Sequence, residues 1–229
     1  MKFGLELEFG LNPEDRENAE RFITSQEGEL KSDGSINTQY SHIAREINTK
    51  VYSIEELKEV ENLFNSFYSD YVKEINKSMG LHIHVSFEKM GDYNALFSRR
   101  FIRFFKKKLM DKFGDNQELT KRFNNKYCSN VYPKHYFLGN IDKRHKMINY
   151  QAYSKHGTIE FRIFNAPQTA KGVMDYLLFT LETITIYLSI YNKVFIQNVT
   201  IEREETPKIE LIEVVNSKIE KININGLRC

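Results

Sequence analysis

Residues 80–87, GLHIHVSF, place two histidines two positions apart within an apolar run. A β-strand points alternate side chains to opposite faces, so His82, His84 and Ser86 are expected on the face opposite the apolar residues. Three further segments alternate in the same way, and their polar positions hold carboxylates, an asparagine and a guanidinium. These positions are Glu6 and Glu8 in residues 2–10, Glu46 and Asn48 in residues 44–53, and Glu160 and Arg162 in residues 157–164.

These polar side chains would gather on one surface if the apolar faces of the four strands pack beneath a single layer of helices. Burying unpaired charges costs several kcal/mol per ion, and divalent cations are the usual remedy. Glu6 and Glu8 would lie about 6.6–7 Å apart along a strand, so two ions about 3.5–4 Å apart fit the pair more easily than one ion does. Carboxylates favour Mg²⁺ or Mn²⁺, and an added imidazole is compatible with Mn²⁺. Arg162 would add a planar fork of donors that suits a phosphate or a carboxylate.

Each motif alone also has a simpler explanation. Glu-x-Glu on an amphipathic strand is commonly a solvated face, Glu-x-Arg is commonly a cross-strand salt bridge, and an exposed strand tolerates histidine. Three strands that present metal-ligand side chains in phase with their apolar faces are more informative than any one motif. The combination indicates a metal-dependent enzyme.

Alternating and helical periodicities together predict an α+β fold, with a curved, mainly antiparallel sheet and helices on its apolar face. Strands are expected at residues 2–10, 44–53 and 80–87, and as a hairpin of 146–153 and 157–164 around SKHG; Asp33-Gly34 adds a hairpin signal. Helices are expected at 53–78, 93–113, 115–126 and 168–192, with a short helix or loop at 12–24 and a further helix that has Pro207 in its first turn. Ser53 and Glu56 form a capping-box pattern.

The composition is that of a folded chain. The 229 residues, 41% of them hydrophobic, suit a single domain 1–229 with a core at about 1–192 and a C-terminal extension at 193–229. The two cysteines form no disulfide framework, and carboxylates interrupt the N-terminus where a signal peptide would be apolar. The apolar stretch 176–191 is short for a membrane span and contains Glu182, which favours a buried helix. We therefore expect a cytoplasmic protein with no membrane partner.

One segment, RRFIRFFKKK at residues 99–108, is strongly basic. It could attract an acidic peptide, a polyglutamate or a nucleic acid, or it could be the solvated face of an amphipathic helix. The formal net charge of +2, from 33 basic and 31 acidic residues, does not favour a dedicated nucleic-acid binder.

Five motifs resemble the amidoligase family, which belongs to the superfamily of glutamine synthetase and glutamate–cysteine ligase. They are FGLELEFG, SDGSI, REI, GLHIHVSF and RHKMINYQAYSKHGTIEFRIF, in order over about residues 1–190. The resemblance implies an ATP-dependent carboxylate–amine ligase that works through an acyl phosphate. It also implies the curved antiparallel sheet of the glutamine synthetase catalytic domain with the active site on its concave face, which would explain the absence of a GxxxxGK[ST] loop.

The resemblance implies roles for individual residues, with ATP and Mg²⁺ or Mn²⁺ as cofactors. Glu8 and Glu46 would hold one metal ion, and Glu6, His82 and Glu160 the other. His84, Ser86 and Asn149 would lie near the nucleotide, Arg162 and Arg144 would stabilise the transferred phosphoryl group, and Asp33 would contact the amine or be a plain turn residue. The substrates would be a small-molecule or peptide carboxylate and an amine, and the family suggests a glutamine-handling partner enzyme. The segment INTKVYS departs from the expected proline-containing turn, and we expect the acceptor pocket in residues 127–145.

Two other functions stay open at this point. A metal-dependent phosphohydrolase or nuclease could use the same acidic cluster, although the sequence offers no separate general base for water. A non-catalytic nucleotide-binding module could keep the sheet and the metal ligands without turnover. The sequence leaves the acid, the amine and the oligomeric state undetermined.

Overall fold

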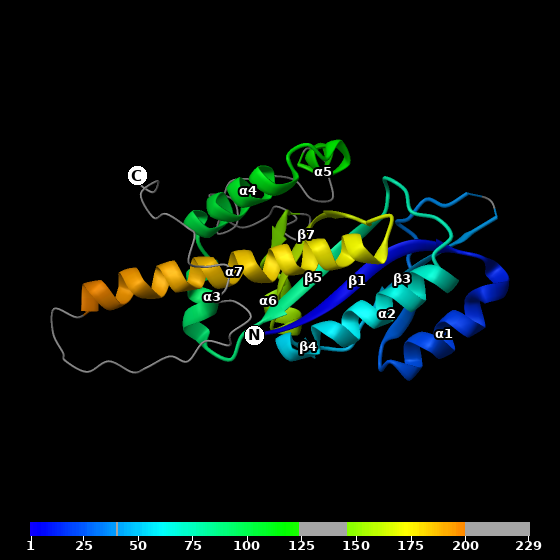
Figure 1. Cartoon of the computed structure of the whole chain (residues 1–229), viewed down its shortest axis with the longest axis horizontal. Helices are drawn as coiled ribbons and strands as arrows, with labels where there is room; N and C mark the ends of the chain where they lie inside the picture. The colour runs from blue at the N-terminus through cyan, green and yellow to red at the C-terminus, as the bar shows by residue number, and fades with distance from the viewer. Residues whose placement is uncertain (40, 124–145, 200–229) are drawn as a thin grey trace. The chain divides into compact units, whose positions relative to one another are not determined.

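The computed structural model describes residues 1–39, 41–123 and 146–199, with the side chains of 193–199 left out. The contacts divide the chain into two units, residues 1–191 and 192–229, and the second lies almost wholly outside the described residues. The fold of the first unit combines helices with an open antiparallel sheet (Figure 1), which confirms the predicted α+β class. The helix expected after Pro207 and the segment 127–145 lie outside the described residues.

The sheet has strand order β2-β3-β1-β5-β7-β6, with β4 also paired to β1, and every pairing is antiparallel. The strands are β1 (Lys2–Leu11), β2 (Glu29–Ser32), β3 (Ile43–Asn48), β4 (Tyr52–Ser53), β5 (Gly80–Ser86), β6 (Ile148–Asn149) and β7 (Ile159–Asn165). The long strands β1 and β5 lie at the centre because their apolar residues are almost fully buried, as Leu7 and Ile83 illustrate.

Seven α-helices accompany the sheet in the described ranges. They are α1 (Arg16–Ser25), α2 (Leu57–Asp70), α3 (Met90–Leu96), α4 (Arg99–Phe113), α5 (Gln117–Arg122), α6 (Ala152–His156) and α7 (Ala170–Val199). Figure 1 shows α2 running alongside β1 and β3, and α7 crossing β5 and β7. Aromatic pairs join the apolar face of the sheet to the helices, with ring centroids 5.1 Å apart for Phe9–Phe67 of α2, 4.9 Å for Phe161–Phe105 of α4 and 4.6 Å for Phe164–Tyr176 of α7. The opposite face of the sheet carries the polar side chains that alternate with these apolar residues.

The strand register brings the polar positions together. On β1, Glu6 lies opposite His82 of β5, and Glu8 lies opposite Glu46 of β3. His84 lies opposite Glu160 of β7. Because side chains alternate with a period of two and the other face is buried, this register places all six side chains on one face of the sheet.

The expected strand 44–53 is wrong in its middle, since β3 ends at Asn48 and β4 begins at Tyr52. The hydroxyl of Thr49 accepts the N–H of Leu5 at 3.0 Å, and the N–H of Thr49 donates to the Leu5 carbonyl at 2.9 Å. The Thr49 hydroxyl takes the place of a backbone carbonyl as the acceptor for Leu5. The regular pairing of β3 with β1 therefore ends at Asn48. The capping box of Ser53 and Glu56 is confirmed.

Three helix boundaries also differ from the sequence-based expectation. The helix expected at 53–78 ends at Asp70, because the following backbone turns to exchange hydrogen bonds between Glu74 and Gly10. The helix expected at 93–113 is two helices, because Ser98 caps α4 by accepting the N–H of Phe101. The helix expected at 115–126 is the shorter α5, and the long helix expected at 168–192 is α7.

The two hairpins expected from the sequence have longer connections than their turn signals suggested. Strands β6 and β7 pair, but the residues between them form α6, which ends at Gly157 in the left-handed conformation with φ of 67°. Strands β2 and β3 pair across residues 33–42 rather than across a two-residue Asp-Gly turn.

A β-bulge interrupts the pairing of β5 with β7. It places His82 opposite two residues of β7, Arg162 and Ile163.

Helix α7 is long and apolar enough over Ala170–Asn192 to cross a membrane by length and composition. Half of its most apolar window is buried inside the fold. Leu177, Phe179 and Ile184 belong to the core, and α7 packs on β7 through Tyr176. These contacts are those of a core helix. The sequence favoured a buried helix here because Glu182 lies within the apolar stretch 176–191.

Candidate metal centre

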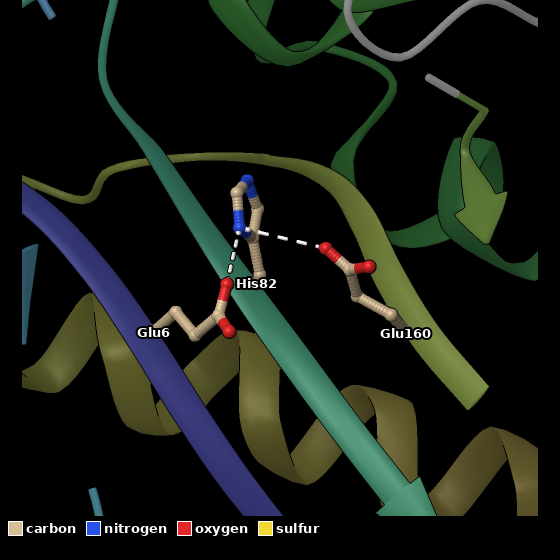
Figure 2. A group of neighbouring side chains, drawn as sticks. All are labelled: Glu6, His82 and Glu160. Carbon is tan, nitrogen blue, oxygen red and sulfur yellow. Dashed lines mark hydrogen bonds and ion pairs between the residues drawn. The ribbon is translucent and has the colours of Figure 1, made fainter. Parts of the chain in front are cut away.

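The imidazole of His82 lies at the centre of the polar face. Its Nδ1 is 3.0 Å from Glu6 Oε2 and 3.6 Å from Glu160 Oε1. Figure 2 shows the two carboxylates pointing toward the ring from the strands on either side of β5. One ligand atom from each of these three residues lies within 4.8 Å of the others, so the group could hold a metal ion.

A second group shares the same histidine. His82 Nε2 is 3.8 Å from Glu8 Oε1, and Glu8, Glu46 and His82 again offer ligand atoms within 4.8 Å of one another. A neutral imidazole has one nitrogen lone pair and one N–H. The ring can therefore coordinate an ion in one group while it donates a hydrogen bond to a carboxylate of the other.

The carboxylate of Glu8 is held from the start of β5. Its Oε2 accepts the N–H of Gly80 at 2.5 Å. A Cβ at position 80 would lie 2.9 Å from Arg122 Nη2 and 3.2 Å from His82 Nε2, so the side chain of Arg122 would have to shift to admit one. Arg122, which α5 contributes, is itself buried and donates to the Met79 carbonyl at 3.0 Å. The start of β5 thus packs tightly against the candidate ligands.

The carboxylate of Glu160 is fixed by two neighbours. Asn149 Nδ2 donates to its Oε2 at 2.5 Å, and Arg162 Nη1 donates to its Oε1 at 2.5 Å. The carbonyl oxygen of the Asn149 side chain accepts the N–H of Gln151 at 3.0 Å, at the start of α6. Asn149 therefore connects a candidate ligand to the helix that borders the pocket.

Burial shifts the pKa values of the carboxylates in different directions. Burial tends to raise the pKa of Glu6, but hydrogen bonds from His82 and His84 outweigh it and bring this pKa well below its usual range. Burial raises the pKa of Glu8, against the charge of His82 and the Gly80 hydrogen bond. Burial and the nearby charge of Glu6 raise the pKa of Glu46 to about 7. Glu8 and Glu46 thus lack full compensation for their charges, which is the condition that favours a bound cation.

His84 lies one pleat further along β5. Its Nδ1 is 2.9 Å from the Thr158 hydroxyl, and its Nε2 is 3.2 Å from Glu6 Oε1. Burial alone would lower the pKa of this histidine, but the hydrogen bond to Glu6 and the charges of Glu6 and Glu160 raise it. A protonated His84 would compensate part of the negative charge on the Glu6 side.

The four carboxylates and two histidines described above border one pocket of about 340 Å³. It is lined by Glu6, Glu8, Asp33, Ser35, Glu46, His82, His84, Asn149, Gln151, Ala152, Lys155, His156, Glu160 and Arg162. Asp33 accepts the N–H of Ser35 at 2.7 Å in a turn, as its position before Gly34 had suggested. The structure thus brings together nine of the eleven candidate residues named from the sequence.

Two candidate residues are not in this set. Ser86 ends β5 opposite Lys2 and is not among the residues that line the pocket, so its predicted place near the nucleotide finds no support in the geometry. Arg144 lies outside the described residues.

The sequence reasoning also missed residues that line the pocket, chiefly Lys155 and His156. Both belong to the segment SKHG, which was interpreted as a hairpin turn. The helix α6 instead turns them toward the pocket, where the rings of His156 and His84 lie 6.3 Å apart in a T-shaped arrangement. A basic pair directly before the Glu160 strand was the one signal that could have singled them out.

An open antiparallel sheet with two carboxylate–imidazole groups in one polar pocket defines the chain as an α+β protein with a candidate metal centre. Residues 1–138 match the model of the family described as "putative amidoligase enzyme", which covers more than half of the chain, and the protein belongs to this family. The family name indicates a ligase and confirms the resemblance seen in the motifs. The match includes Glu6, Glu8, Glu46 and His82 but ends before Glu160. No match was found among the curated proteins.

Proposed function

We propose that the protein is an ATP-dependent ligase that joins a carboxylate to an amine, with Mg²⁺ or Mn²⁺ in the two groups around His82. In the proposed reaction, the substrate carboxylate takes the γ-phosphate of ATP, and the amine then displaces phosphate to form an amide. The observation that carries the proposal is the pair of ligand groups sharing one histidine, in a chain that belongs to the amidoligases.

The donor atoms suit such ions. Both groups offer carboxylate oxygens with one imidazole nitrogen, a set that hard divalent cations accept and that Mn²⁺ tolerates well. Glu6 and Glu160 would hold one ion and Glu8 and Glu46 the other, with His82 completing one of the two groups. Bound there, the ions would neutralise phosphate charge and orient the nucleotide.

Arg162 would stabilise the phosphoryl group during its transfer. Its Nη1 is occupied by Glu160, which fixes the plane of the guanidinium. The side chain lines the pocket, so its planar guanidinium would donate hydrogen bonds to a bound phosphate or carboxylate. His84 would bind the nucleotide phosphates beside it, and Asn149 would keep Glu160 in place.

Asp33 would bind the attacking amine. It lines the pocket, and its charge contributes to the raised pKa values of Glu8 and Glu46. A carboxylate at this position would attract an ammonium group and would accept a proton from it during attack.

The proposal is tested by screening ADP release from Mg²⁺-ATP against candidate acids and amines, followed by mass spectrometry. The expected product is lighter by one water than the sum of acid and amine. Glu8→Gln and Glu160→Gln should lose Mn²⁺ binding and ADP release together, whereas Glu118→Gln, on an exposed ion pair of α5, should keep both. ADP release without an amine would indicate a phosphohydrolase. Binding of Mn²⁺ and ATP without any phosphate release would indicate a non-catalytic module.

A further inference from the structure

The outward face of α4 carries five cations. Arg99, Arg103 and Lys107 follow one another at intervals of four residues, about 6 Å apart along the helix. Arg100 and Lys106 flank this row, because residues that differ by three, four or seven positions share one side of a helix. Arg99, Arg100, Arg103 and Lys107 are exposed, and Lys106 is half-buried. We call these five residues the basic face.

The basic face destabilises the helix that carries it. Arg99 and Arg100 occupy the first turn, which has no acidic residue, and there their charges oppose the helix macrodipole. The pairs Arg99–Arg103 and Arg103–Lys107 place like charges at i and i+4, which also disfavours the helix. No carboxylate forms an ion pair with the five side chains within the ranges that the structure describes.

The packing of α4 does not require Arg99, Arg103 and Lys107, whereas the Lys106 ammonium lies 5.2 Å from the centre of the Phe123 ring. Phe101, Phe105 and Leu109 bury the opposite side of the helix in the core, and Phe101 and Phe105 contact Phe161 of the sheet with centroids 6.3 and 4.9 Å away. Apolar burial therefore fixes α4 without help from its charged side. A row of like charges that folding does not need, and that weakens the helix, indicates a partner that compensates it.

We propose that the basic face binds an acidic segment of another polypeptide, rich in glutamate or aspartate. Guanidinium groups bind carboxylates through paired hydrogen bonds, and a row of cations complements a row of carboxylates along an extended chain. The polar pocket with its candidate metal ligands lies on the other face of the sheet, so this surface is separate from the site of the proposed reaction.

Two other polyanions fit the face less well. Single-stranded nucleic acids use aromatic side chains on which bases stack, and the exposed large apolar side chains of the described residues include no aromatic ring. A peripheral membrane helix inserts an apolar side between lipids, but the apolar side of α4 is already buried in the core.

The test uses the full chain and a fluorescent peptide of about eight glutamates, long enough to exceed the distance of about 12 Å from Arg99 to Lys107. Fluorescence anisotropy should show binding at low ionic strength that weakens steadily as salt is added. The triple variant Arg99→Gln, Arg103→Gln, Lys107→Gln should bind at least ten-fold more weakly. It should also melt about 2 °C or more above the wild type, since like-charge repulsion and the unfavourable first turn are relieved.

The matched control is Lys58→Gln, Lys89→Gln, Lys171→Gln, which removes the same charge from exposed positions elsewhere and should keep the affinity. The proposal is overturned if the wild type does not bind the glutamate peptide, or if the control loses as much affinity as the triple variant. It is also overturned if the triple variant has a lower melting temperature than the wild type. It is equally overturned if single-stranded RNA, duplex DNA or vesicles containing phosphatidylserine bind the face more tightly than the peptide does.

Discussion

Glu46 makes the stability of the metal-free protein depend on pH in a way that can be measured. The carboxyl lies on β3 opposite Glu8, and burial with the charge of Glu6 raises its pKa from the ordinary 4.5 to about 7. Between these two values the folded protein holds a proton that the unfolded chain has released. The unfolded chain therefore binds fewer protons, and the free energy of unfolding falls as pH rises from about 4.5 to above 7.

The shift sets the size of the effect. Since one pKa unit corresponds to about 1.36 kcal/mol, the shift of Glu46 corresponds to at most about 3 kcal/mol of lost stability at pH 8. Solvent reduces this figure because Glu46 is only partly buried. The raised pKa values of Glu8 and His84 act in the same direction, whereas the lowered pKa of Glu6 changes stability only in more acidic solution.

Comparing the wild type with Glu46→Gln separates the contribution of Glu46 to the pH dependence of the free energy of unfolding. Urea unfolding in EDTA, followed by circular dichroism at pH 5 and pH 8, should show that Glu46→Gln loses about 2 kcal/mol less than the wild type over this range. Glu29→Gln, at an exposed position of the neighbouring strand β2, should follow the wild type. Parallel pH profiles for Glu46→Gln and wild type would refute the reasoning, because Glu46 would then not be a buried, uncompensated acid.

Three further changes probe the surroundings of the site. Arg162→Lys should reduce turnover far more than melting temperature, because a lysine cannot reproduce the fork of donors; an equal loss of both would make Arg162 structural. Asn149→Ala should weaken Mn²⁺ binding by about 10–100-fold in a calorimetric titration, since it frees the Glu160 carboxylate, and unchanged affinity would contradict its positioning role. Gly80→Ala should lower the free energy of unfolding by about 1–3 kcal/mol, because the new methyl meets Arg122 at 2.9 Å; wild-type stability in urea would show that this contact relaxes freely.

The position of the candidate ligands could be predicted because alternation is a strong constraint. Once Leu5, Leu7 and Ile83 face the core, the residues between them must face the other way. A shift of one residue between β1 and β5 would have buried Glu6 and exposed Leu7. The pairing of Glu6 with His82 is therefore the register that the apolar pattern demands.

The parts that the sequence did not reveal depend on contacts between distant segments. The bulge that opposes His82 to two residues of β7 exists only once β5 and β7 are paired. The break between α3 and α4 depends on Ser98, whose hydroxyl could as well have faced solvent in a longer helix. Helix α6 follows Asn149, which binds Glu160 and the N–H of Gln151 at once, and a local pattern cannot show that double contact.

The two ligand groups differ in how their charges are compensated, and this difference predicts how they bind ions. Glu6 and Glu160 have His84 and Arg162 beside them, whereas burial raises the pKa of Glu8, and burial with the charges of Glu6 and Glu8 raises the pKa of Glu46 to about 7. A divalent ion in the second group must displace the proton of Glu46, so Mn²⁺ should stabilise the wild type more at pH 8 than at pH 5. In Glu46→Gln this pH dependence of Mn²⁺ stabilisation should largely disappear. The substitution removes the carboxyl whose proton competes with the ion, and it also removes one ligand. If Mn²⁺ stabilised the wild type equally at both pH values in a thermal-shift titration, the ion would not bind to the Glu8–Glu46 group.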